Sequence, residues 1–340
     1  MKAHRWVVAS RPTGFDVAAS LAVEEVDVAG PGPGEFLVRT TYLRAAAPMF
    51  KVLVSGSADG RPPTPIGDPV VGAGIGTVVE SDHPDFPIGT DVTGSFPWQD
   101  VVRSNGRSLV PVQPVVLPLG IPVTAPLHVL GGPGLSAWFG LTEFADAKLG
   151  DTIVVSTAAG AVGAIVCQLA KLQGCRVVGI TSSRDKADWL VGELGIEGAV
   201  AYRTDDVSAR LRELCPDGID VYFDNVGGDT LDIVLQQLAV GARVVLCGAS
   251  SQYDRGAADW QGPTHYFELV YKQATMRGFY IFNFVSRFPE GRRRLAELIS
   301  AGKLRSPEDV VDGFENAPAA FERVLAGRNL GVQLVRIGQL

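Results

Sequence analysis

Hydrophobic and polar residues follow two different rhythms along this chain, and the change comes near Gly140. Before it, over roughly the first 120 residues, short apolar runs alternate with Gly and Pro, as in RWVVAS, FLVRT and DVTGSF. Short strands separated by turn residues predict a β-rich domain, in the form of a small, partly closed β-barrel. The polar, Pro-rich stretch SGSADGRPPTP predicts a mobile loop.

Beyond Gly140, runs of strand length alternate with runs of helical periodicity. The strand-like runs are TIVVST, CRVVGITSS, VAYR, IDVYFDNV and ARVVLCGA. Helical patterns lie between them, one ending at Gln173 and others covering residues 185–194, 207–214 and 230–238. A strand-like GFYIFNF, a helix over residues 289–300 and a final strand VQLVRI follow. Apolar strands joined by crossover helices predict an α/β domain with a parallel sheet covered on both sides.

The composition is that of a globular protein, with 46% hydrophobic and 20% charged residues. At roughly 150 residues per domain, 340 residues predict about two domains. The formal net charge of −7 argues against a protein that binds nucleic acid or an anionic membrane surface.

The sequence also predicts a compartment. The start, MKAHRWVVAS, lacks the apolar core of a secretory signal, and no apolar run approaches the ~20 residues of a membrane-spanning helix. The cysteines lie in or beside apolar runs, as reduced and buried thiols do: Cys167, Cys175, Cys215 and Cys247. We therefore expect a cytoplasmic protein that does not enter membranes.

The sharpest local signal is TIVVSTAAGAVGAIVCQLAK, where a strand leads into Ala158-x-Gly160-x-x-Gly163 and then a helix. Small residues allow the chain to turn tightly, so that backbone N–H groups approach a pyrophosphate at the helix N-terminus. Ala158 replaces the usual first glycine, which weakens the motif, but the strand–turn–helix setting supports a dinucleotide site. The alternative is a tight turn in an ordinary α/β domain.

The end of the following strand indicates which nicotinamide cofactor binds. An NAD site places a carboxylate roughly 20 residues beyond the glycines, and here that position is Ser183. With Arg184 and Lys186 beside it, the run offers a hydroxyl and two cations where a 2′-phosphate would lie. Asp185 is the opposing charge. These residues favour NADPH, and the alternative is a solvated helix start.

No group of side chains suggests a metal site. The first ~160 residues contain no cysteine, and the histidines have no partner at ligand spacing. We interpret these histidines as surface or packing residues: His4, His83, His128 and His265.

Taken together, these residues resemble the zinc-independent medium-chain dehydrogenase/reductase superfamily, in its branch of prostaglandin reductases and alkenal double-bond reductases. The resemblance lies in RWVVASRPTG, PGPGEFLVRT, GPGLSAWFGL, TAAGAVG, DVYFDNVGG, CGASSQY and GFENAPAAFERVLAGRNLG. It implies a GroES-like, partly closed barrel domain at residues 1–123 and 308–340. A Rossmann-type, doubly wound domain would be inserted at residues 124–307.

The resemblance implies NADPH-dependent reduction of the carbon–carbon double bond of an α,β-unsaturated carbonyl compound, without metal. Gly160, Ala161, Val162 and Gly163 would contact the pyrophosphate. Lys186 and Tyr202 match the residues that meet the 2′-phosphate. Further cofactor contacts are implied at Asn225, Cys247, Gly248, Ala249, Ser250, Tyr253, Phe279, Tyr280, Ile281 and Asn329. Tyr253 matches a tyrosine near the nicotinamide and is the candidate for delivering a proton. The resemblance also implies a homodimer.

Residues 43–50 depart from this branch. It usually has Leu-Ser-x-Asp-Pro-Tyr-Met-Arg where this chain reads LRAAAPMF. Two charges and a phenol are lost from a segment that lines the family's substrate cleft. Pro48, Met49 and Phe50 therefore predict a bulky, apolar substrate, because buried apolar contact replaces the missing polar partners. The alternative is a repacked core segment without substrate contact.

Other functions stay open on the same scaffold. A quinone or carbonyl reductase, or a tailoring oxidoreductase acting on an unusual conjugated intermediate, would also use NADPH. A non-catalytic NADPH-binding protein is the rival from a different class. Turnover of NADPH with any enone would separate it from the enzymes.

Overall fold

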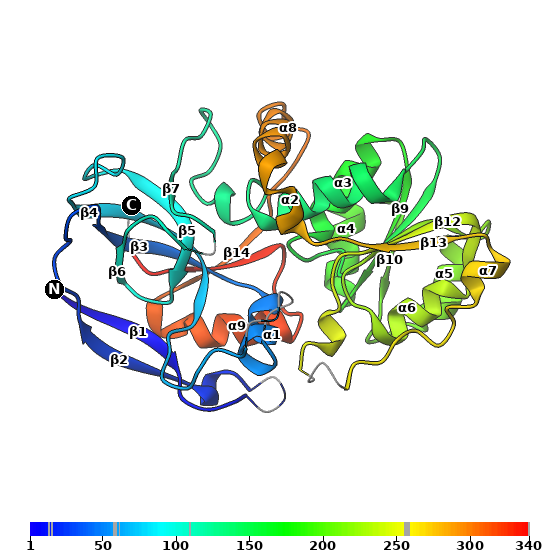
Figure 1. Ribbon diagram of the computed structural model, residues 1–340. Helices are drawn as coiled ribbons and strands as arrows, with labels where there is room; N and C mark the ends of the chain where they lie inside the picture. The colour runs from blue at the N-terminus through cyan, green and yellow to red at the C-terminus, as the bar shows by residue number, and fades with distance from the viewer. Residues whose placement is uncertain are drawn as a thin grey trace. The chain divides into compact units, whose positions relative to one another are not determined.

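The computed structural model describes residues 1–12, 14, 16–56, 60, 62–108, 110–254 and 259–338 (Figure 1). They divide into two compact units. The first comprises the described parts of Met1–Leu127, Tyr253–Ala258 and Glu308–Leu340, and the second comprises His128–Gln252 and Asp259–Pro307. The domain boundaries expected after residues 123 and 307 stay a prediction.

The second unit is built on a six-stranded parallel sheet of order β10-β9-β8-β11-β12-β13. Its strands are β8 (Thr152–Ser156), β9 (Arg176–Thr181), β10 (Gly198–Ala201), β11 (Ile219–Asp224), β12 (Leu238–Leu246) and β13 (Thr275–Gly278). In chain order the strands run 3-2-1-4-5-6 across the sheet, which is the Rossmann arrangement. The predicted parallel α/β domain is confirmed.

Helices cover both faces of this sheet (Figure 1). The helices of this unit are α2 (Gly132–Phe139), α3 (Gly163–Leu172), α4 (Arg184–Glu193), α5 (Val207–Leu214), α6 (Gly228–Leu235), α7 (Glu268–Tyr271) and α8 (Phe288–Ser300). Leu211 of α5 and Leu231 and Val234 of α6 are buried in one cluster with Val154 and Tyr222 of the sheet. Burying these side chains against the sheet stabilises the unit, because the apolar area is removed from water.

The segment after β13 differs from the prediction. GFYIFNF was expected to be a strand, but β13 ends at Gly278 and a 3-10 helix occupies Ile281–Arg287. The ring of Phe279 stacks on Phe144 at 5.1 Å, and Phe284 stacks on Phe139 at 4.9 Å. These aromatic residues pack on preceding helical segments instead of extending the sheet, so the strand prediction was wrong beyond Gly278.

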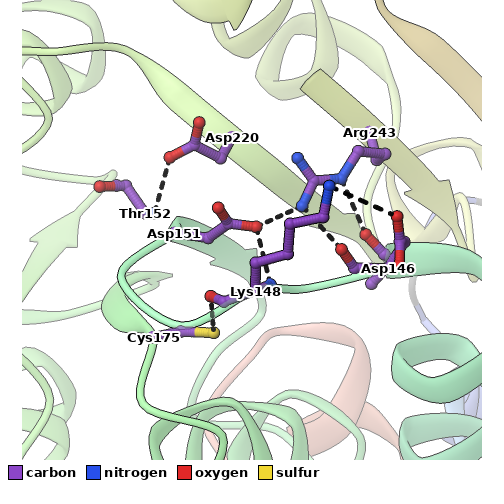
Figure 2. A network of polar contacts seen from close by, with 8 residues as sticks. Asp146, Lys148, Asp151, Thr152, Cys175, Asp220 and Arg243 are labelled. Atoms are coloured by element: carbon purple, nitrogen blue, oxygen red, sulfur yellow. Dashed lines mark hydrogen bonds and ion pairs between the residues drawn. The ribbon is translucent and has the colours of Figure 1, made fainter. Parts of the chain in front are cut away.

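A polar network fixes the loop before β8 (Figure 2). Arg243 donates to the carbonyl oxygens of Ala145 and Asp146 at 2.9 Å and pairs with the Asp151 carboxylate. Asp151 also accepts from the backbone N–H of Lys148 at 2.9 Å. The network lies at the amino ends of the strands, whereas ligands of open parallel sheets bind at the carboxyl ends. Its role is therefore structural.

The first unit is mainly antiparallel. Its larger sheet has the order β14-β15-β3-β4-β5-β7, with β6 also paired to β3, and β1 and β2 form a separate pair. The strands are β1 (Lys2–Val8), β2 (Leu21–Asp27), β3 (Phe36–Ala45), β4 (Val71–Ser81), β5 (Asp91–Pro97), β6 (Val101–Ser104), β7 (Gln113–Pro114), β14 (Glu308–Asp312) and β15 (Val332–Arg336). The separate β-rich domain is confirmed, and within the described residues its sheet is not a fully closed barrel.

Two helices pack with this sheet, α1 (Ala47–Val54) and α9 (Ala317–Leu325). Phe50 of α1, Phe321 of α9 and Trp98 are fully buried in one apolar cluster with Leu43 and Val335 of the sheet. The Phe50 and Phe321 rings meet edge to face at 6.4 Å. Residues of the C-terminal segment, among them Phe321 and Val335, are thus part of the core of the first unit.

Part of the predicted mobile loop, residues 57–59 and 61, lies outside the described residues. Over the described part of the chain, no helix combines the length and apolar character needed to cross a membrane.

The cysteines are free thiols, and burial raises the pKa of Cys167 to about 12. The Cys167 thiol is therefore protonated at neutral pH and not nucleophilic.

Candidate functional site

Residues predicted to bind the cofactor follow the carboxyl end of every strand of the parallel sheet. The turn to Gly163 follows β8, the run to Lys186 follows β9, and Tyr202 follows β10. Asn225 follows β11, residues 247–250 follow β12, and residues 279–281 follow β13. Because parallel strands end at one edge of a sheet, this is the edge at which such folds bind ligands.

The turn between β8 and α3 leaves no room for a side chain at its two glycines. A Cβ on Gly163 would lie 2.3 Å from the carbonyl oxygen of Thr157, and one on Gly160 would lie 2.7 Å from the Thr157 Cγ2 atom. Thr157 itself has a positive φ of 50°, which is rare for a β-branched residue. The small residues of the motif are therefore required by the backbone path.

This turn presents backbone donors. Ala164 N–H bonds to Gly160 O at 3.0 Å, and Ile165 N–H bonds to Val162 O at 3.1 Å. The N–H groups of Val162 and Gly163 have no acceptor within the described residues. The first turn of a helix that begins with free donors is suited to an anion, and the close-packed glycines let one approach. The turn therefore fits the pyrophosphate of a dinucleotide.

The corner formed by the ends of β9 and β10 gathers cations. Tyr202 N–H bonds to Thr181 O at 2.9 Å, which holds the two strand ends together. Lys186 lies in the first turn of α4 and is half-buried. The guanidinium of Arg203 lies over the Tyr202 ring, 5.7 Å from its centre. This corner therefore offers positive charge beside an aromatic ring, as the 2′-phosphate prediction requires.

The other predicted cation, Arg184, forms an ion pair on the surface. Arg184 pairs with Asp205 at 2.5 Å, and Asp205 also accepts from Ala201 N–H at 2.9 Å. The backbone hydrogen bond from Ala201 is the largest cause that lowers the pKa of Asp205, so its carboxylate stays ionised. Arg184 is thus less available to a phosphate than its position in the sequence suggested. Ser183 is the residue before α4 and makes no side-chain cap.

A buried polar cluster orders the end of β11. The Asp224 Oδ1 atom accepts from Tyr222 OH at 2.9 Å, from Ser156 Oγ at 3.2 Å, and from two backbone N–H groups. Asn225 donates from its backbone and its side chain to Ser156, both at 2.8 Å. Burial raises the pKa of Asp224, although its hydrogen bonds oppose the shift. The cluster fixes Asn225 at the edge of the sheet.

The ends of β12 and β13 are tied to the same edge. Cys247 N–H and Gly248 N–H both donate to Asp224 O, at 2.8 Å and 3.1 Å. Ser250 N–H bonds to Asn225 O at 3.2 Å, and Phe279 N–H bonds to Leu246 O at 3.4 Å. The last members of this set, Ala249, Tyr280 and Ile281, lie beside these residues in the chain, and Tyr280 is exposed.

The remaining predicted residues belong to the first unit. Asn329 is buried and donates to Gly331 O at 2.8 Å. Tyr253 is half-buried and packs against the apolar cluster that contains Phe50. In α1, Pro48 is exposed and Met49 is half-buried, whereas Phe50 has no exposed surface.

The structure adds polar residues that the sequence did not single out. Ser156 and Asp224 terminate their strands with side chains buried in hydrogen bonds, and Arg203 adds a cation at the β10 end. The signal for Asp224 was present, since a carboxylate that closes an apolar strand must find buried donors. Among the described residues, no three His, Cys, Asp or Glu side chains gather as metal ligands would.

Comparisons with known proteins extend over the whole chain. The family model for zinc-binding dehydrogenases matches residues 161–297, and that for the N-terminal domain of oxidoreductases matches residues 4–112. NADPH-dependent curcumin reductase of Escherichia coli (strain K12) is 38% identical over 341 residues, covering 98% of this chain and 96% of the relative. Prostaglandin reductase 1 of Bos taurus is 34% identical over 336 residues, covering 98% and 99%.

A solved structure supports the same relationship. CurA from Vibrio vulnificus in complex with NADPH is similar to this chain with a TM-score of 0.91 at 34% identity. The match covers 99% of this chain and 100% of the CurA chain.

Proposed function

We propose a function from the premise that the chain belongs to the zinc-independent medium-chain dehydrogenase/reductase superfamily, in the branch of prostaglandin and alkenal reductases. The chain is an NADPH-dependent oxidoreductase acting on carbon–carbon double bonds. Its reaction is reduction of the double bond of an α,β-unsaturated carbonyl compound. The observation that carries this proposal is that residues predicted to bind NADPH follow the carboxyl end of every strand of the parallel sheet.

NADPH, when bound, supplies the hydride that adds to the β-carbon of the conjugated substrate. The protein's share is to hold the cofactor: the turn at Gly160–Gly163 at the pyrophosphate, and Lys186 and Tyr202 at the 2′-phosphate. Asn225, residues 247–250, residues 279–281 and Asn329 complete the contacts. The Tyr253 hydroxyl holds the proton that the substrate α-carbon gains. Conjugation already activates the β-carbon, so no metal is required in this proposal.

The substrate in this proposal is bulky and largely apolar. Exposed Pro48 stands where the family has tyrosine, and with half-buried Met49 it offers apolar surface in a segment that lacks the family's two charged side chains. Phe50 is buried, so it contributes by holding α1 in place. A carboxylated substrate would lose polar partners at this segment, which is costly in a water-poor cleft.

The experiment is a panel of small enals, aromatic enones, carboxylated enones, quinones and simple ketones, each incubated with purified protein and NADPH. Saturated ketone or aldehyde products, formed fastest from the aromatic enones, are expected. Hydroquinone or alcohol products alone would favour the quinone or carbonyl reductase alternative, which the altered segment 43–50 keeps open. Tight NADPH binding without turnover on the whole panel would favour a non-catalytic binding protein.

The role of Tyr253 has its own test. A positioned proton donor contributes about 10²–10⁴-fold, and water can replace it at an enolate, so Tyr253→Phe should lower kcat towards the small end of that range. An unchanged kcat with a raised Kd for NADPH would instead assign Tyr253 to cofactor binding. Metal independence is checked in the same assay, since turnover should survive prolonged EDTA treatment.

The proposal includes a cytoplasmic homodimer. β13 ends the parallel sheet and pairs only with β12 within the described residues, which leaves an edge open to a second chain. Beside it in sequence, α7 and its flank expose Tyr266, Phe267, Val270 and Tyr271, each at least half exposed, at 59%, 51%, 61% and 68%. An open edge with an apolar surface suits a self-complementary contact. Light scattering should give twice the monomer mass, and Val270→Glu should reduce it.

A further inference from the structure

His128 is fully buried at the base of the nucleotide-binding turn, within the second unit. Its Nε2 atom lies 2.9 Å from the carbonyl oxygen of Ala161, and its Nδ1 atom lies 2.6 Å from Ser306 Oγ. Because a carbonyl oxygen can only accept, Nε2 carries a proton and donates it to the Ala161 carbonyl.

The Ala161 carbonyl, which accepts from His128, takes no part in the hydrogen bonds of the α3 helix. Ala164 N–H bonds to Gly160 O and Ile165 N–H bonds to Val162 O, so neither reaches Ala161 O. Within the described residues the His128 ring is the donor that satisfies this carbonyl. Without it the peptide between Ala161 and Val162 would have no internal partner to set its orientation.

The orientation of that peptide determines where a donor points. In a trans peptide the C=O and N–H groups point in opposite directions, so fixing the Ala161 oxygen also fixes the Val162 N–H. That N–H has no acceptor within the described residues and lies in the turn that fits a pyrophosphate. The loop carrying Ser306 is itself held on α3, because Arg305 and Gln168 exchange hydrogen bonds at 2.7 Å and 3.0 Å.

We propose that His128 is a positioning residue that locks the Ala161–Val162 peptide so that the Val162 N–H is presented to the pyrophosphate of the cofactor. This inference rests on the proposed function, because it needs the turn to hold a dinucleotide. Its consequence is specific. NADPH and NADH share the pyrophosphate, so the His128 hydrogen bond contributes equally to the affinity for both.

The test measures Kd for NADPH and for NADH by calorimetry, alongside the melting temperature without cofactor. His128→Phe keeps a ring and removes the donor, and we expect both Kd values to rise by about tenfold. His128→Gln places an amide N–H near the Nε2 position and should recover most of the affinity. His128→Asn is one methylene shorter, reaches only the Nδ1 position, and should not. His4→Phe, at an exposed histidine of the first unit, is the matched control and should bind as wild type.

The outcomes separate the two proposals. If wild-type protein binds neither nucleotide, the proposed function fails. If wild type binds but His128→Phe binds equally well, or Gln and Asn behave alike, the positioning role is overturned. A rise in Kd for NADPH alone would also overturn it, since that pattern belongs to the 2′-phosphate. Should His128→Phe not fold, the comparison of Gln with Asn decides the matter.

Discussion

Two segments of this protein make the same local move, from a strand into a helix, for opposite physical reasons. The turn between β8 and α3 excludes side chains at its glycines: a Cβ on Gly163 would lie 2.3 Å from the Thr157 carbonyl oxygen. The passage from β3 into α1 is organised by side chains: Phe50 and Leu53 are buried in the core of the first unit. In the β8–α3 turn the backbone N–H groups form the functional surface. In the β3–α1 passage the backbone only carries the side chains that pack in the core.

This difference decides how far a sequence can be interpreted. A turn that must bring N–H groups to an anion requires small residues at fixed spacing, so the requirement is visible in the letters. A helix that packs by shape accepts many apolar residues, so the letters do not say which side chains face the core. The two segments therefore predict different responses to mutation.

The largest effect is expected at Phe50. Phe50→Ala removes a fully buried ring and should lower the free energy of unfolding by about 3–5 kcal/mol, measured by urea denaturation. At a temperature where the variant stays folded, we expect its preference among substrates to be unchanged. Met49→Ala, at the half-buried neighbour, should lose little stability and alter that preference. The reverse pattern would mean that α1 presents Phe50 to the substrate.

Gly163 should show the next largest effect, for the opposite reason. Gly163→Ala adds one methyl group against the backbone of Thr157 and Ala158, which we expect to cost about 1–3 kcal/mol of stability and to weaken NADPH binding. The matched control is Gly192→Ala in α4, where a Cβ meets no atom within 4 Å. That change should stabilise the protein by about 0.5–1 kcal/mol. Equal effects of the two substitutions would show that the turn is not sterically restricted.

At the 2′-phosphate corner the expected loss is smaller and selective. Lys186→Ala should raise the Kd for NADPH by about tenfold and leave NADH little changed, because one charge-assisted hydrogen bond is lost. Arg184→Ala should have a weaker effect, since Arg184 already pairs with Asp205. Similar affinity of the wild type for NADPH and NADH would contradict the cofactor assignment altogether.

Most of the second unit could also be predicted from the sequence, although from a different signal than the turn. Buried parallel strands are apolar throughout, so β8 and β9 could be recognised from composition alone. GFYIFNF failed because aromatic rings that pack on helices produce the same apolar run as a strand. Periodicity cannot separate these cases over so short a segment.

In the candidate site, too, local backbone requirements could be predicted from the sequence, whereas contacts between distant residues could not. Backbone requirements at Gly160 and Gly163 were visible, whereas His128 was interpreted only as a surface or packing histidine. Its contact with Ala161 joins positions 33 residues apart, and only the fold brings them together. The ion pair of Arg184 with Asp205 was hidden for the same reason, since the partners lie on successive strand ends.

The smallest effect is expected in the first unit, where the surroundings of two glutamates shift their pKa values in opposite directions. Glu308 is half-buried, and burial raises its pKa above 4.5, although a hydrogen bond from Thr124 opposes the shift. The folded protein therefore holds this proton to higher pH than the unfolded chain does. Stability contributed by the neutral form is complete in acid and is lost as pH rises through the raised pKa.

Glu308→Gln keeps the acceptor for Thr124 and removes the titration, so the variant should gain stability over wild type as the pH rises above 4.5. Glu35→Gln is the matched substitution of opposite sign. Hydrogen bonds from Arg103 and Gly32 lower the pKa of Glu35, so its ionised form stabilises the fold at neutral pH. That variant should be less stable than wild type at neutral pH, with the deficit vanishing in acid. Urea denaturation across pH measures both differences, and slopes of the same sign would refute the account.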